Sequence, residues 1–296
     1  MNKKKILIAT DFSPGAHNAT LYGMQLAKAM RADAILFSAC YLEPPSGARN
    51  VKVWHIALME ETKKKLADEA DALVKEHDIQ LEIDCREGPP HEAILAIAKE
   101  KSVDLVVVGM KDSGKDVKQL FGSTTTSLVN NLLTPTITVP PGTSFTTPEN
   151  ILYASDVFLD TSISPIDQVK WLTDFFESKL FVIRVVRDSY EEGRENVNTS
   201  LNLGAGLQTL NTSFSFPVDK NVTNGSTESV REQIVDLVIM MPRNEEWLGR
   251  LFVKSDKKDM MFHSHVPILM LPDTTISKRD AVQTTDNDGY HKMGRI

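Results

Sequence analysis

An internal repeat limits the fold of this chain more than any other feature. Three segments of the first half return in the same order in the second half: residues 6–12 as 151–157, residues 103–106 as 235–238, and residues 135–140 as 267–272. The first pair is 145 residues apart, and the other two pairs are 132 apart. Ordered echoes at a nearly constant spacing indicate two similar structural units. Because the spacing falls by 13, the second copy is predicted to be that much shorter between its first and fourth strands.

The length of 296 residues suits two domains of roughly 150 residues each. We expect a first domain at residues 1–142, a turn-rich linker at 143–149, and a second domain at 150–272. Residues 273–296 are polar and poor in apolar side chains, which predicts a flexible tail.

Strands and helices alternate through the first copy. Short apolar runs predict strands, and helical periodicity of apolar residues predicts the segments between them. In chain order, the expected strands are residues 5–10, 34–41, 79–84, 104–109 and 136–139, and the expected helices are 17–30, 56–77, 91–101 and 120–132. Such alternation is typical of α/β domains whose parallel strands are joined by right-handed crossovers. The sequence therefore predicts two tandem, doubly wound parallel sheets.

Ligands of doubly wound sheets bind beyond the carboxyl ends of the strands. Asp11 follows the first predicted strand, and Gly109 ends the fourth. We therefore expect these two residues to lie on the same rim of the first sheet.

The strand ending in Asp11, the Val-Val-Val-Gly109 strand, and the later Gly122-Ser123-Thr124 together resemble the universal stress protein family. This resemblance implies a Rossmann-like sheet of five strands, of the flavodoxin-like or adenine nucleotide alpha hydrolase-like type. It also implies pairing through the last strand, so that tandem copies in one chain form an internal pseudo-dimer. Pairing of whole chains into a homodimer stays open.

ATP-binding members of this family carry the motif Gly-x2-Gly-x9-Gly-Ser/Thr. Here Gly109 and Gly122 have the motif's separation and Ser123 follows correctly, but Asp112 replaces the middle glycine and Gly114 comes two residues later. The resemblance implies a site for an adenine nucleotide, ATP or AMP with or without magnesium. The candidate site residues are Asp11 and Val108 with Gly109 at the base and ribose, Ala39 beside them, and Asp112, Gly114, Gly122, Ser123 and Thr124 in the phosphate loop.

The interpretation of the function depends on the effect of Asp112 on phosphate binding. A carboxylate in the loop repels phosphate and lacks the backbone freedom of glycine, although Lys111 and Lys115 can offset its charge. One hypothesis is a stress-response binding protein whose first domain holds the nucleotide. The alternative is a protein-interaction module in which both loops are vestigial, and a weaker alternative is a slow ATP hydrolase. No set of residues typical of a dedicated catalytic site is present in the sequence, which favours binding over catalysis.

The second copy departs further from the motif. Met241-Pro242 stands where Gly109-Met110 stood, and Val253-Lys254-Ser255 stands in place of Gly122-Ser123-Thr124. A branched valine would block the approach of phosphate to the backbone. We therefore expect the second domain to serve as a degenerate pairing scaffold.

Charge and composition exclude other classes. The net charge of −7 argues against nucleic-acid binding. The apolar run at residues 6–9 is too short for an export signal or a membrane span, which predicts a cytoplasmic protein without a membrane partner. Cys40 and Cys85 are then expected to be reduced thiols. His263 and His265 are interpreted as packing residues rather than metal ligands, so no metal site is expected.

Overall fold

The computed structural model describes residues 3–41, 50–77, 79–111, 123–131, 133–155, 165–184, 212–215, 235–242 and 266–272. In the first half it has β1 (Lys5–Ala9), α1 (Pro14–Met30), β2 (Asp33–Cys40), α2 (Val51–His77), β3 (Leu81–Glu87), α3 (Pro90–Glu100), β4 (Leu105–Gly109), α5 (Ser123–Asn130) and β5 (Thr136–Val139). In the second half it has β6 (Asn150–Ser155), α6 (Pro165–Phe176), β7 (Lys179–Arg184), β8 (Thr212–Ser215), β9 (Leu237–Met240) and β10 (Ile268–Met270).

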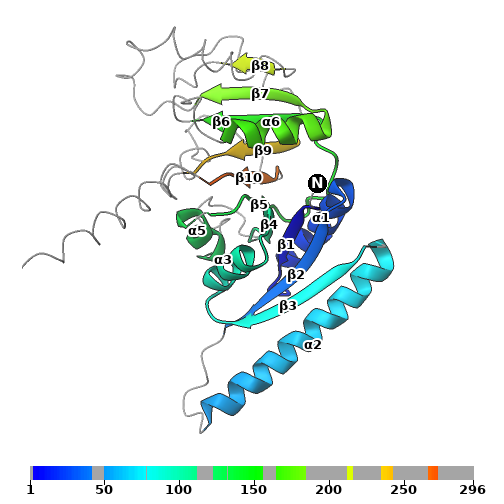
Figure 1. The fold of residues 1–296 in the computed structure, drawn as a ribbon, viewed down its shortest axis with the longest axis vertical. Coiled ribbons are helices and arrows are strands. Elements are labelled where there is room, and N and C mark those ends of the chain that lie inside the picture. Colours follow the sequence, from blue (N-terminus) through cyan, green and yellow to red (C-terminus); the bar gives the residue numbers. More distant parts are fainter. Residues whose placement is uncertain are drawn as a thin grey trace, which may run out of the picture.

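Within the described residues, ten strands form one sheet in the order β3-β2-β1-β4-β5-β10-β9-β6-β7-β8. Figure 1 shows this sheet as a continuous stack, with the first half in blue to green and the second half beyond it. The second half repeats the strand order of the first, and each half is parallel within itself. The predicted α/β fold is confirmed, and the two predicted sheets are joined into one.

The two halves meet through antiparallel pairing of β5 with β10, in which Ile137 lies opposite Leu269. This is the internal edge-to-edge pairing that the family resemblance implied. One buried apolar cluster runs without interruption from Ile6 and Ile8 of β1 to Ile151 and Tyr153 of β6. The halves therefore share a core as well as a sheet.

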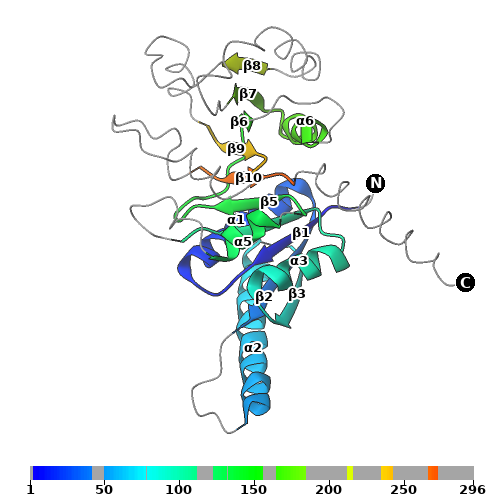
Figure 2. The same ribbon diagram turned by 90° about the vertical axis from the view of Figure 1, so that its left-hand side faces the viewer.

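Two layers of helices cover the first half. Buried side chains of α1 and α2 pack on one face of the sheet in the same cluster as those of α6. The opposite face packs against α3 and α5 through a second cluster that includes Leu7, Ile94 and Leu128. Figure 2 shows these layers from the side, with α2 extending beyond the sheet. None of the helices in the described ranges is both long and apolar enough to cross a membrane.

The repeated Val-Asp-Leu-Val segment has the same structural role in both halves. The Asp104 carboxylate accepts a hydrogen bond from the backbone N–H of Lys5 at 2.9 Å, and Asp236 accepts one from Asn150 at 2.8 Å. Each aspartate also donates its own backbone N–H to the same partner residue, at 2.9 Å in both halves. The repeated aspartate therefore fixes the register between the first and fourth strands of each half.

Two predicted boundaries were wrong by several residues. The helix expected at 56–77 already begins at Val51, because the Asn50 side chain caps it by accepting a hydrogen bond from the N–H of Val53 at 3.2 Å. The strand expected at 79–84 runs instead from Leu81 to Glu87, where it pairs along its whole length with β2.

Candidate functional site

A cleft opens at the carboxyl ends of β1 and β4, where the rim was expected. Its volume is about 420 Å³. We call it the rim cleft; the described residues that line it come from the β1–α1 turn, the ends of β2 and β4, and the first turns of α3 and α5. Three helices begin around this opening, as the doubly wound arrangement requires.

The structure brings six of the nine candidate site residues together around the rim cleft: Asp11, Ala39, Val108, Gly109, Ser123 and Thr124. The other three, Asp112, Gly114 and Gly122, lie outside the described residues. The lining also includes several residues that the sequence reasoning did not assign to a site, among them Phe37, Ile94 and Thr125.

The floor of the rim cleft is apolar. Phe37, Ile94 and Val108 are almost completely buried in the core between the sheet and α3, and Ala39 packs against the same cluster. These side chains make the bottom of the cleft apolar. Such a surface suits a planar ring rather than a charged group.

The polar groups of the cleft lie at its rim. Asp11 is exposed and its Oδ1 accepts a hydrogen bond from the N–H of Ser13 at 3.0 Å, while Ser13 Oγ caps α1 by accepting from the N–H of Ala16 at 3.2 Å. The next residue after Asp11, Phe12, has a φ of 64°. A bulky residue in this left-handed region is uncommon, and it orients the turn that carries Asp11.

The first turn of α5 lines the opposite side of the opening. It presents Ser123 and Thr124, of which Ser123 is exposed, above the buried Thr125. The first N–H groups of any helix lack partners within the helix and carry partial positive charge, so a helix start attracts anions. Lys111 is exposed at the same rim. The rim therefore combines an anion-attracting edge with an apolar floor.

Gly109 has a packing role that the sequence did not reveal. A Cβ built on Gly109 would lie 2.6 Å from the carbonyl oxygen of Gly15, and one built on Gly15 would lie 2.7 Å from that of Met110. The two glycines let β4 and α1 approach backbone to backbone. Gly15 follows Pro14 in the helix, where glycine is about 1 kcal/mol less favourable than alanine. A glycine at such a position in the sequence indicates a close approach of two backbones.

The second half has no comparable described rim. Met241 and Pro242 follow β9, at the positions equivalent to Gly109 and Met110. Asp156, Val253, Lys254 and Ser255 lie outside the described residues, as do His263, His265 and Lys115. Within the described ranges, no group of three or more His, Cys, Asp or Glu side chains is placed to hold a metal ion.

Comparison with known proteins agrees with this architecture. Residues 2–140 match the model of the universal stress protein family. A universal stress protein from Methanocaldococcus jannaschii is 24% identical over 138 residues, which cover 46% of this chain and 81% of that protein. The similarity to the universal stress protein family thus lies in the first half of the chain.

Solved structures show the same fold over nearly the whole chain. A universal stress protein from Archaeoglobus fulgidus is 15% identical and superposes with a TM-score of 0.64, covering 92% of this chain and 99% of that chain. A protein of unknown function from Pseudomonas aeruginosa is 12% identical with a TM-score of 0.53, covering 96% and 98% respectively. The two-half arrangement is therefore shared with known folds.

Proposed function

We propose that the first half of this chain binds an adenine nucleotide, ATP or AMP, in the rim cleft, and that the second half is a degenerate pairing scaffold. The observation that carries the proposal is the shape of the cleft. An apolar floor of Phe37, Ile94 and Val108 lies next to the start of α5. A nucleotide has the matching parts, a flat base and an anionic phosphate chain.

Each part of the nucleotide has a partner in this arrangement. The base lies on the floor near Val108 and Ala39, and the exposed carboxylate of Asp11 accepts hydrogen bonds from ribose hydroxyls. The phosphates meet the N–H groups of α5 and the hydroxyls of Ser123 and Thr124. Magnesium would then be held mainly by phosphate oxygens and water.

The proposal concerns binding, with a regulatory role in the stress response and a cytoplasmic location as the family and the sequence suggest. Hydrolysis would require a base placed to activate water. Asp11 is the one carboxylate among the described lining residues, and the proposal assigns it to the ribose. Slow turnover of ATP is therefore not part of the proposed function.

Isothermal titration with ATP, with and without magnesium, tests the proposal on three proteins: wild type, Gly122→Val and Asp112→Gly. Gly122→Val puts a branched side chain where phosphate must approach, and binding should be lost. Asp112→Gly removes a charge of the same sign as phosphate, worth about 1 kcal/mol, so affinity should rise several-fold. Unchanged affinity in both variants, with folding verified by circular dichroism, would refute a nucleotide in this cleft.

A protein-interaction module is the second candidate, and one observation favours it. Three apolar side chains near the start of α2, Val51, Val53 and Ile56, are 44%, 58% and 56% exposed. All three lie in the first two turns of α2. If no nucleotide binds in the titration, this surface becomes the place to look for function.

A further inference from the structure

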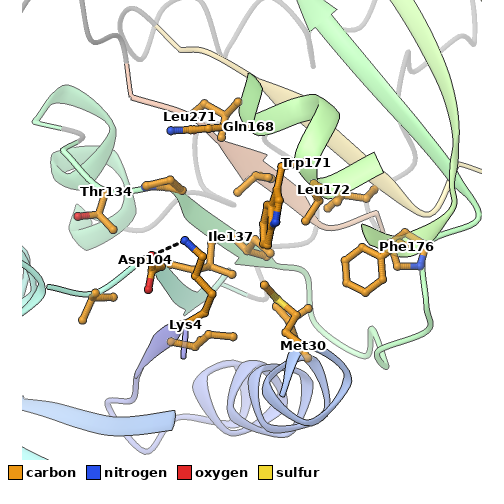
Figure 3. Close-up of a pocket in the computed structure, with 18 of the residues that line it drawn as sticks. Lys4, Met30, Asp104, Thr134, Ile137, Gln168, Trp171, Leu172, Phe176 and Leu271 are labelled. Carbon is orange, nitrogen blue, oxygen red and sulfur yellow. Dashed lines mark hydrogen bonds and ion pairs between the residues drawn. The ribbon is translucent and has the colours of Figure 1, made fainter. Parts of the chain in front are cut away.

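A second cavity lies at the junction of the two halves, between α1 and α6. Its volume is about 320 Å³, and it shares no lining residue with the rim cleft. We call it the junction cavity. Figure 3 shows Met30 reaching into it from α1, and Trp171 and Gln168 from α6.

The junction cavity follows from the way the halves pair. α1 and α6 pack on the same face of the sheet, each over its own half. Between them, Ile137 of β5 and Leu269 of β10 stand opposite each other and form the floor. The segment between the halves covers one side, where Phe145 packs edge to face on Tyr22 at 5.3 Å between ring centroids. No described helix lies over the middle of this floor.

Large apolar side chains remain exposed at this cavity. Trp171 is 42% exposed and Leu133 is 64% exposed, and both line it. Scattered exposed apolar residues are ordinary, but a group gathered around a hollow marks a binding surface. The cavity therefore has solvent-exposed apolar side chains in its lining in addition to empty volume.

The charged groups beside the cavity neutralise each other. Lys4 Nζ is 2.7 Å from Asp104 Oδ1 and 5.5 Å from the centroid of the Trp171 ring. Tyr22 is neutral because burial, with the nearby charge of Asp236, raises the pKa of its hydroxyl. A ligand here meets no net charge, which favours an uncharged molecule.

We propose that the junction cavity binds a small, uncharged, apolar molecule of about two fused rings. The volume stands at the lower end of ligand pockets, which span about 300–1,000 Å³. The lining, with Trp171 and Phe176 on one side and Met30 and Leu26 on the other, suits an aromatic ligand. This site is separate from the proposed nucleotide site and does not depend on it.

Two probes that differ in charge test the proposal on the full chain. 2-Naphthol is uncharged near neutral pH, and naphthalene-2-sulfonate has the same rings with one negative charge. Binding is followed by the ¹⁵N-indole signal of Trp171 in two-dimensional NMR, assigned with Trp171→Phe. We expect saturable shifts of that signal with 2-naphthol. Naphthalene-2-sulfonate should bind at least about tenfold more weakly, because Lys4 beside the cavity is already paired with Asp104.

A filling variant tests the location independently. Met30→Trp adds an indole from α1 into the cavity and should weaken 2-naphthol binding by at least about tenfold. Val74→Trp is the matched control, because Val74 is 40% exposed on α2 and lies away from the cavity lining. Its affinity should equal that of the wild type. The proposal is overturned if wild type shows no saturable shift with 2-naphthol, if Met30→Trp binds 2-naphthol as well as Val74→Trp, or if naphthalene-2-sulfonate binds as tightly as 2-naphthol.

Discussion

Two glycines allow β4 and α1 to pack backbone against backbone beside the rim cleft. Gly109 and Gly15 each leave no room for a methyl group, because the nearest atom in each case is a backbone carbonyl oxygen. Backbone cannot rotate away as a long side chain can. Gly109 is therefore needed for the fold, whatever it contributes to a ligand.

We predict that Gly109→Ala lowers the free energy of unfolding by about 1–3 kcal/mol, the range of overpacked sites. Urea unfolding followed by circular dichroism measures this. Gly15→Ala adds a methyl group at the same contact from the α1 side and should lower the free energy of unfolding by a similar amount. The double variant should cost less than the sum, because both methyl groups disturb one interface. A Gly109→Ala protein as stable as wild type would contradict the packing role.

Cys85 is the second residue for which the structure supports a specific prediction, here of the reactivity of its thiol. Burial, with a smaller effect of the neighbouring Cys40, raises the pKa of its thiol from 9.0 to about 11. Both cysteines are free thiols, as expected from the sequence. Because the thiolate is the reactive form, Cys85 is protonated and slow to react near neutral pH.

In a Cys40→Ser protein, iodoacetamide should modify Cys85 at pH 7.5 roughly a hundredfold more slowly than an unperturbed thiol, since each pKa unit removes tenfold of thiolate. The rate should keep rising with pH past 9. Mass spectrometry of timed samples measures it. A rate that levels off below pH 9 would show that the thiol is not held in its protonated form.

Among the elements, the first and fourth strands of each half are tied together by an aspartate. Asp236 accepts hydrogen bonds from the N–H groups of Glu149 and Asn150, at 2.9 and 2.8 Å. Asp104 does the same for Lys5 and also holds the ammonium of Lys4. These carboxylates set where β6 and β1 begin.

Asp236→Ala should lower the free energy of unfolding by about 1–3 kcal/mol, because the part-buried N–H of Asn150 and the exposed N–H of Glu149 both lose their acceptor. Asp236→Asn keeps one acceptor oxygen and should lose less. Urea unfolding of both variants, monitored by tryptophan fluorescence, provides the comparison. Equal stability of Asp236→Ala and wild type would show that the strand start is fixed by packing alone.

The elements were predictable from the sequence where local pattern decides them. β5 lies where its apolar run predicted, and Ser13 caps α1 one residue before Pro14. The candidate site was partly predictable, because Asp11 and Ser123 follow from the motif. The floor was not, since Phe37 and Ile94 reach it through packing between segments far apart in the sequence. The junction cavity depends on contacts between both halves, which no local pattern encodes.

At the scale of the whole molecule, pairing of β5 with β10 turns two five-stranded halves into one sheet, with one buried cluster shared between the halves. Each of these strands would otherwise present an unpaired apolar edge, which invites association with another chain. The domain boundaries at residues 142 and 150 remain predictions, and they can be tested through this edge.

A fragment of residues 1–146 should expose the β5 edge and form dimers through it. Sedimentation at rising concentration measures the association, and a Thr138→Pro substitution in the fragment should weaken it by removing a donor from the edge. The full chain, whose β5 edge is occupied by β10, is the control. A fragment that folds and stays monomeric at high concentration would contradict pairing as the role of this edge.

The central claim is that one half binds nucleotide and the other supports it. The most direct test is the stoichiometry of ATP binding to the full chain by isothermal titration, repeated with Val253→Gly in the second half as a matched change. The account predicts one site per chain in both proteins, with the same affinity. Two equal sites in the wild type, or a second site gained with Val253→Gly alone, would contradict it.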